Sequence, residues 1–200
     1  MFYHIEGIVS EIEQNLAVID CAGVGYGLNV TTNTLSALKP GSKAKLFVSE
    51  SIGENNFDLY GFISKNEKRC FEMLTSVSGI GPKAALSILS YNSPESLSLA
   101  IINNDEKALT GAPGIGKQIA QRVILELKDK IGKELNSIDF SLPVTSAPLN
   151  AGDSNMSDAM AALSVLGYSS AEIAPILKQM DLSGLNAEQI IKTVLKQMVK

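Results

Sequence analysis

The chain has 200 residues, of which 45% are hydrophobic, so it is long enough to bury one sizeable core or two or three small ones. Its formal net charge of −4 excludes a protein that is basic over its whole surface, and no apolar run approaches the length of a membrane span. The two cysteines, Cys21 and Cys70, lack metal-ligand spacing and follow no secretory segment, so we expect a cytoplasmic protein without a disulfide.

Residues 1–64 predict a small β-barrel. Gly, Asn and Pro signals separate five candidate strands, at residues 2–9, 16–21, 25–31, 43–51 and 56–62. Five strands of this length fit an OB-like barrel, a fold that often binds nucleic acid through exposed aromatic and basic side chains. This segment, however, has three basic side chains against seven acidic ones. We therefore expect core or interface roles for its aromatic residues, Tyr26, Phe47, Phe57, Tyr60 and Phe62.

Residues 65–134 turn helical and contain a repeat. The stretch SGIGPKAALSIL at residues 78–89 returns 35 residues later as PGIGKQIAQRVI at residues 113–124. A duplicated helix-hairpin-helix unit is the simplest interpretation. One Gly-x-Gly between helices is often only a tight connection, whereas two copies in register favour DNA binding.

The repeated hairpin suits phosphate binding for a geometric reason. Glycine adopts positive φ, and it lets the main chain approach a partner closely because no Cβ intervenes. The helix that follows presents free N–H groups and the positive end of its dipole, and a lysine at the helix start adds charge. We expect both isoleucines to point inward and the binding to ignore base sequence. The predicted DNA-binding residues are Gly79, Ile80, Gly81, Lys83, Gly114, Ile115, Gly116, Lys117 and Arg122.

The charge distribution agrees with that prediction. Residues 65–133 carry ten basic side chains against seven acidic ones, whereas residues 134–200 carry four against seven. Only the middle of the chain is basic, so we expect one focused contact with DNA amid acidic surroundings.

Two nucleotide-binding patterns are present in part. Residues 111–117 have the spacing of a phosphate loop, but Gln118 stands where Ser or Thr would bind magnesium, and residues 107–110 read as helix. Residues 79–84 resemble a dinucleotide fingerprint, yet no βαβ unit surrounds them. His4, the only histidine, lies in the first predicted strand and is interpreted as structural. We expect no catalytic residue, no metal site and no cofactor.

The last third of the chain predicts a tethered module. Residues 135–156 show no hydrophobic periodicity and are rich in Ser, Asn, Pro and Gly, as is typical of a flexible linker. In residues 157–200 we expect helices at 157–166, 170–180 and 187–198. Gly167 would end the first, Ser169 and Glu172 would form a capping box for the second, and Pro175 would shift or kink it. Such a module usually docks onto a partner protein; the alternative is an appendage folded back on the main body.

The whole pattern is that of an α+β multidomain chain, and it resembles the RuvA family of Holliday-junction-binding proteins. The resemblance covers essentially the whole chain and is carried by GVGYG at 23–27, DLYGF at 58–62, the two hairpins, and ALSVLGY at 162–168. It implies a homotetramer, used singly or as a facing pair, that holds a four-way DNA junction open in a square.

The same resemblance implies protein partners. The third domain would bind RuvB, a hexameric ATPase that moves the DNA arms, with Leu163, Leu166 and Tyr168 as candidate contacts. The resolvase RuvC would join the complex. The subunit itself would not be an enzyme.

The resemblance also implies an acidic pin, a hairpin tip near the fourfold axis whose carboxylates repel phosphates. Glu54 matches the pin, but Asn55 stands where a second acid is common, so a weaker pin is expected. Gln118 similarly replaces a lysine often seen after the second hairpin. Two alternatives remain open: a general duplex-binding or repair-enzyme accessory domain, and an enzyme that uses the partial phosphate loop.

Overall fold

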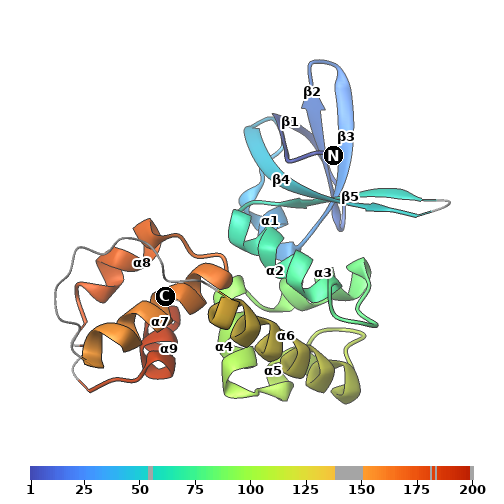
Figure 1. The fold of residues 1–200 in the computed structure, drawn as a ribbon. Helices are drawn as coiled ribbons and strands as arrows, with labels where there is room; N and C mark the ends of the chain where they lie inside the picture. Colours follow the sequence, from blue (N-terminus) through green and yellow to red (C-terminus); the bar gives the residue numbers. More distant parts are fainter. Residues whose placement is uncertain (54–55, 138–150, 181, 183, 199–200) are drawn as a thin grey trace.

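The structure is a computed structural model that describes residues 1–53, 56–137, 151–180, 182 and 184–198. Three parts follow one another along the chain: a β-barrel, a helical domain that contains both hairpins (the hairpin domain, α2 to α6), and a helical C-terminal module (α7 to α9). In Figure 1 the barrel lies at the top, the hairpin domain beneath it and the module at the lower left. The predicted α+β multidomain architecture is confirmed.

The barrel is closed and has the strand order β1-β2-β3-β5-β4. Neighbouring strands are antiparallel, except that β3 and β5 pair in parallel. Alternate aliphatic side chains point inward and fill the barrel, as the two-residue period of a strand requires. The five predicted strands are confirmed with small shifts of their ends: β1 (His4–Ile12), β2 (Leu16–Cys21), β3 (Val24–Val30), β4 (Lys43–Ile52) and β5 (Phe57–Phe62).

A short helix, α1 (Thr32–Ala37), connects β3 to β4, although the sequence pattern did not predict it. Thr31 caps this helix, because its hydroxyl accepts a hydrogen bond from the Thr34 backbone N–H at 3.0 Å. Neighbouring β-branched threonines have low helix propensity, so the sequence pattern does not indicate a helix here. The helix packs beside α3 and so lies where the barrel meets the hairpin domain.

The hairpin domain shares its core with the barrel. Tyr60 and Phe62 of β5 pack on Phe71 of α2, with ring centroids 5.0 and 4.9 Å apart. Core positions for these two barrel aromatics are confirmed, whereas Phe57 is 56% exposed. The described helices of the domain are α2 (Lys65–Thr75), α3 (Pro82–Tyr91), α4 (Pro94–Asn103), α5 (Glu106–Thr110) and α6 (Lys117–Ser137).

The C-terminal module contains the predicted helices as α7 (Ala151–Val165), α8 (Ser170–Leu177) and α9 (Ala187–Met198). Gly167 follows α7 with a φ of +103°, as expected for a helix end. The predicted capping box is confirmed, since Glu172 accepts a hydrogen bond from the Ser169 backbone N–H at 2.7 Å. Pro175 lies inside α8 and does not shift its start.

The predicted linker bounds, residues 135–156, are too wide. Helix α6 continues to Ser137 and α7 already begins at Ala151. Met156 of α7 packs against the module core, and this contact outweighs the low helix propensity of the Gly, Asp, Ser and Asn that precede it. Residues 138–150 lie outside the described residues.

The module packs directly on the hairpin domain, so the structure shows the folded-back alternative. Met73, Leu99 and Ile102 of the hairpin domain pack against the module core. Arg69 also donates a hydrogen bond from Nε to the Val165 carbonyl at 2.5 Å. Among the helices of the described residues, none combines enough length with enough hydropathy to cross a bilayer.

Candidate nucleic-acid interface

The two hairpins have the same backbone geometry. The first glycine of each turn has positive φ, +86° at Gly79 and +82° at Gly114. Ile80 and Ile115 are only 6% and 5% exposed and belong to the core of the hairpin domain. Their predicted inward orientation is confirmed, so these isoleucines fix the turns and present only their main chain to a partner.

The second glycine of each turn has free space around it. Gly81 has an ordinary φ of −84°, and Gly116 likewise has no positive φ. A Cβ built on either residue would find no atom of the described residues within 4 Å. Within the described residues, no neighbouring atom and no positive φ therefore requires glycine at these two positions. The missing side chains instead leave room for a partner to approach the main chain closely.

Each second glycine also begins a helix. Gly81 accepts the first helical hydrogen bond of α3 from Ala85 N, and Gly116 accepts that of α6 from Ala120 N, both at 3.0 Å. The N–H groups of a first helical turn have no intrahelical acceptor, and no side chain caps α3. Free N–H groups at a helix start can bind an anion, and the exposed side chains of Lys83 and Lys117 lie at the starts of α3 and α6.

Arg122 extends the second hairpin towards the first. A guanidinium nitrogen of Arg122 lies 3.9 Å from the point where a Cβ built on Gly79 would stand. Arg122 Nε donates to Glu126 Oε1 at 2.8 Å, and Glu126 Oε2 accepts from the Ser78 backbone N–H at 3.4 Å. The hydrogen bond from Arg122 is the main cause that holds the pKa of Glu126 below its ordinary value. One carboxylate thus partly neutralises the predicted DNA-binding arginine.

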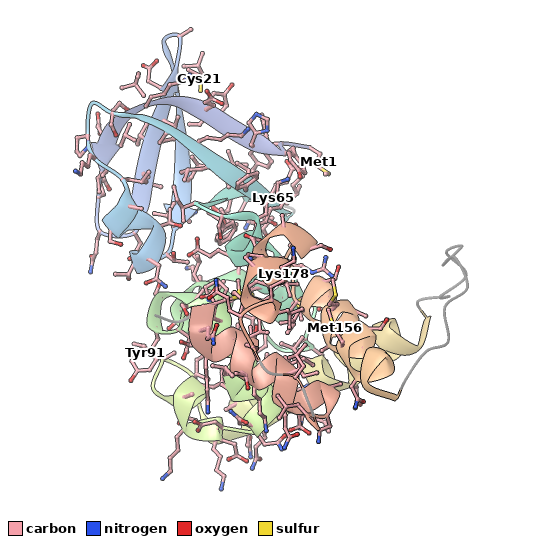
Figure 2. The ribbon with its side chains drawn as sticks, turned by 90° about the vertical axis from the view of Figure 1, so that its left-hand side faces the viewer. Met1, Cys21, Lys65, Tyr91, Met156 and Lys178 are labelled. Carbon is pink, nitrogen blue, oxygen red and sulfur yellow. The ribbon has the colours of Figure 1, made fainter. Side chains whose placement is uncertain are left out.

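A groove of about 690 Å³ continues this surface towards the barrel. Lys83, Ser87 and Tyr91 of α3 line one wall of the groove, and Asn15 and Asn29 of the barrel line the other. Tyr91 was missed by sequence reasoning. It ends α3 outside the spacing of the buried Ala85, Ile88 and Leu89, and that departure is the signal that could have revealed it. Figure 2 shows Tyr91 at the outer edge of the hairpin domain, where it is 60% exposed.

The predicted acidic pin residues, Glu54 and Asn55, lie outside the described residues. The strands that lead to them, β4 and β5, extend towards the right of Figure 1. The loops that precede α3 and α6 face the same side. The C-terminal module lies on the other side of the hairpin domain.

The predicted contacts for a partner protein are buried. Leu163, Leu166 and Tyr168 are 0%, 2% and 2% exposed, so none of them offers a surface in this arrangement. Leu163 belongs to the module core, and Leu166 packs towards Met73 and Leu97 of the hairpin domain. Apolar spacing identifies such residues as buried but does not say against which part of the chain they pack.

The described residues contain no candidate metal centre. Among them, no group of three or more His, Cys, Asp or Glu side chains could hold a metal ion. Burial raises the pKa of the Cys70 thiol to about 12, which keeps it protonated near neutral pH. Helix α5, not a strand, leads into the glycines at 111–116, so the strand that a phosphate loop requires is missing there.

Comparisons with known proteins cover all three parts of the chain. Residues 1–61 match the family model described as the RuvA N terminal domain, residues 71–129 a SAM-like helix-hairpin-helix tandem, and residues 154–199 the RuvA C-terminal domain.

Curated relatives match over most or all of their length. A protein of Ruminiclostridium cellulolyticum is 40% identical over 99% of this chain and 100% of its own length, and one of Clostridium beijerinckii is 38% identical over 100% of both. A Streptomyces coelicolor protein is 40% identical over 86% of this chain and 82% of its own. All three are named Holliday junction branch migration complex subunit RuvA.

Proposed function

This chain belongs to the RuvA family, and from that membership we propose that it binds four-way DNA junctions without sequence specificity and recruits RuvB for branch migration in recombination and repair. Its role is that of a non-catalytic subunit, and ATP hydrolysis resides in RuvB. The observation that carries the proposal is the pair of hairpins on one face, each with an open second glycine, an uncovered helix start and an exposed lysine. Such a surface binds phosphate and reads no base edge.

Selectivity for a junction requires more than one pair of hairpins. We propose a homotetramer, because four copies around an axis would present one hairpin pair to each arm of a junction. Exposed apolar side chains on the barrel support assembly through that part of the chain: Tyr3, Ile52 and Phe57 are 54%, 73% and 56% exposed. In such an assembly Glu54, which falls between β4 and β5 in the sequence, would lie near the axis.

The C-terminal module supplies the proposed docking site for RuvB. It lies across the hairpin domain from the hairpin loops, so a bound motor would not cover the DNA-binding face. RuvC, as a further proposed partner, would act on the same junction.

A gel-shift comparison of a four-way junction with a linear duplex of the same sequence tests the proposal. We expect the junction to be bound much more tightly at equal salt concentration. Equal affinity for both would reject junction recognition and favour a general duplex-binding protein. The mass of the protein with and without junction DNA tests the tetramer, and an ATP titration of the isolated chain tests the nucleotide-site alternative.

A further inference from the structure

A buried carboxylate lies where the barrel meets the hairpin domain. Glu67, in the first turn of α2, is 2% exposed. No ion pair within the described part of the chain includes it. Burying a carboxylate without a cation is unfavourable unless hydrogen bonds replace its water. Glu67 therefore needs hydrogen-bond donors from its surroundings, and an apolar side chain at this position would leave those donors without an acceptor.

The hydrogen bonds to Glu67 come from the barrel. The hydroxyl of Thr31 donates to Oε1, and that of Thr34 donates to Oε2 at 2.7 Å. Both threonines are fully buried. The Ile63 backbone N–H, at the end of β5, donates to the Thr34 hydroxyl at 3.0 Å and to Oε2 at 3.3 Å. The network thus joins the cap of α1, the last barrel strand and the first turn of α2.

The same short helix also binds the helix of the first hairpin. The Thr32 backbone N–H donates to Ser90 Oγ at 3.1 Å, and Asn33 Nδ2 donates to the Leu89 carbonyl at 2.8 Å. Leu89 and Ser90 belong to α3, the helix that begins at the first hairpin and carries Lys83. Helix α1 is therefore bonded on one side to α2 through Glu67 and on the other to α3.

These polar contacts differ in kind from the apolar contact across the same joint. The packing of Tyr60 and Phe62 on Phe71 holds the two parts together, but hydrophobic attraction is not directional and tolerates sliding. Hydrogen bonds weaken steeply when their geometry changes. A carboxylate with both oxygens bonded to one short helix accordingly restricts the angle between the barrel and the hairpins.

We propose that Glu67 is a positioning residue for junction recognition: through Thr31 and Thr34 it fixes the angle at which the hairpins leave the barrel. The inference rests on the proposed function, since that angle matters when four hairpin pairs must meet four arms together. A linear duplex engages hairpins without that requirement. A change of angle would therefore reduce junction affinity through lost simultaneous contacts and leave duplex affinity nearly unchanged.

The test compares Glu67→Gln with Glu72→Gln, which removes the same charge from a side chain of the same helix that is 51% exposed. We expect Glu67→Gln to lower the ratio of junction to duplex affinity about tenfold, since multivalent gains are lost when geometry prevents joint binding. Glu72→Gln should leave the ratio unchanged. An unchanged ratio in Glu67→Gln, or an equal loss on junction and duplex, would overturn the proposal.

Two variants of Thr34 test the same proposal if Glu67→Gln does not fold. Thr34→Val removes the hydroxyl and should reproduce the loss, whereas Thr34→Ser keeps it and should restore the ratio. Small-angle scattering of each free protein measures how the barrel and the hairpin domain are arranged in the absence of DNA. A scattering change in Thr34→Val, absent in Thr34→Ser, supports the joint even if the unaltered protein shows no junction preference, which would reject only the proposed function. Identical scattering and identical ratios for both Thr34 variants would overturn the inference.

Discussion

Ser87 and Arg122 occupy the same position in the two repeats, and each side chain lies against the hairpin of the other repeat. Ser87 Oγ donates to the Pro113 carbonyl at 2.7 Å. A guanidinium nitrogen of Arg122 lies 3.9 Å from the point where a Cβ built on Gly79 would stand. The two units thus face one another with a local twofold relation. Because each helix holds the neighbouring turn, the two proposed phosphate sites are kept at a fixed separation.

Replacing Lys83 and Lys117 together with Ala should weaken binding to junction and duplex alike. Both side chains are exposed at helix starts and have phosphate as their expected partner. Each lost phosphate contact should lower the slope of log affinity against log salt by about 0.9, which gives about 1.8 for every hairpin pair that contacts the DNA. Affinities measured from low to moderate salt check this. Lys178→Ala in the module, an exposed control, should leave the slope unchanged, and an unchanged slope in the double variant would remove both lysines from the site.

Gly81→Ala and Gly116→Ala should separate DNA binding from folding. Neither glycine has positive φ, and an added Cβ meets no described atom within 4 Å. The free energy of unfolding should change by less than about 1 kcal/mol, because a weaker helix cap and a less flexible unfolded chain act in opposite directions. DNA affinity should fall about tenfold if phosphate approaches there, through loss of charge-assisted hydrogen bonds.

Gly79→Ala is the matched comparison for these two variants. Its φ of +86° is unfavourable for any residue with a Cβ, so this change should destabilise the fold by about 1 to 2 kcal/mol. Thermal unfolding and gel shifts on the same samples provide both readouts. Full DNA affinity in Gly81→Ala and Gly116→Ala would show that no partner approaches these glycines.

Glu126→Gln should strengthen binding to every DNA. Glu126 accepts the hydrogen bond of Arg122 at 2.8 Å, and its depressed pKa means that it is charged at neutral pH. Removing this charge frees Arg122 and reduces repulsion of phosphate, so affinity should rise about two- to fivefold at low salt. Glu188→Gln, which removes a similar carboxylate paired with Lys192 in the module, is the control. A weaker interaction with DNA in Glu126→Gln would mean that Glu126 serves to orient Arg122.

Tyr168→Phe should leave stability unchanged or raise it by up to about 1 kcal/mol, because it removes a buried hydroxyl that has no hydrogen-bond partner within the described residues. Burial, with the nearby charge of Glu95, also raises the pKa of Tyr168, so the phenol stays neutral. Denaturant unfolding measures the change, with the exposed Tyr91→Phe as control. A loss of stability would indicate a hydrogen bond to Glu95 or Ser98 in solution.

Truncation after Ser137 should preserve junction binding and abolish stimulation of RuvB. The cut lies beyond both hairpins and removes the module, but it exposes Met73, Leu99 and Ile102. We therefore expect a lower aggregation temperature for the shortened chain. The loss of stimulation is measured as the ATPase activity of RuvB in the presence of junction DNA. Stimulation that survives truncation would place the RuvB contact outside the module.

The structural features that depend on local sequence pattern were predicted correctly. The barrel strands, the turn at Ile80 and the capping box at Ser169 each follow from alternation, glycine geometry or short-range hydrogen bonds. The capped helix α1 escaped because two threonine side chains and a distant carboxylate, Glu67, stabilise it. That contact spans more than thirty residues and leaves no periodic trace.

The site was predicted less completely than the fold. Both lysines stand where the repeat placed them, yet Tyr91 and the barrel wall of the groove were missed, since only tertiary packing brings them to Lys83. The small cavity that Leu166 lines together with Met73 and Leu97 could not be predicted either. Buried residues have similar composition whether they face their own domain or its neighbour.

Helix α6 is 21 residues long, so at the rise of an α-helix it is a rod of about 30 Å. Its first residue, Lys117, follows the second hairpin, and the same helix packs against α7 of the module. One continuous backbone therefore joins the hairpin end of the molecule, where we propose that phosphate binds, to the part that would carry the motor. A rod transmits a displacement along its whole length, so force from a motor on the module would reach the DNA arm through α6 without passing through the barrel.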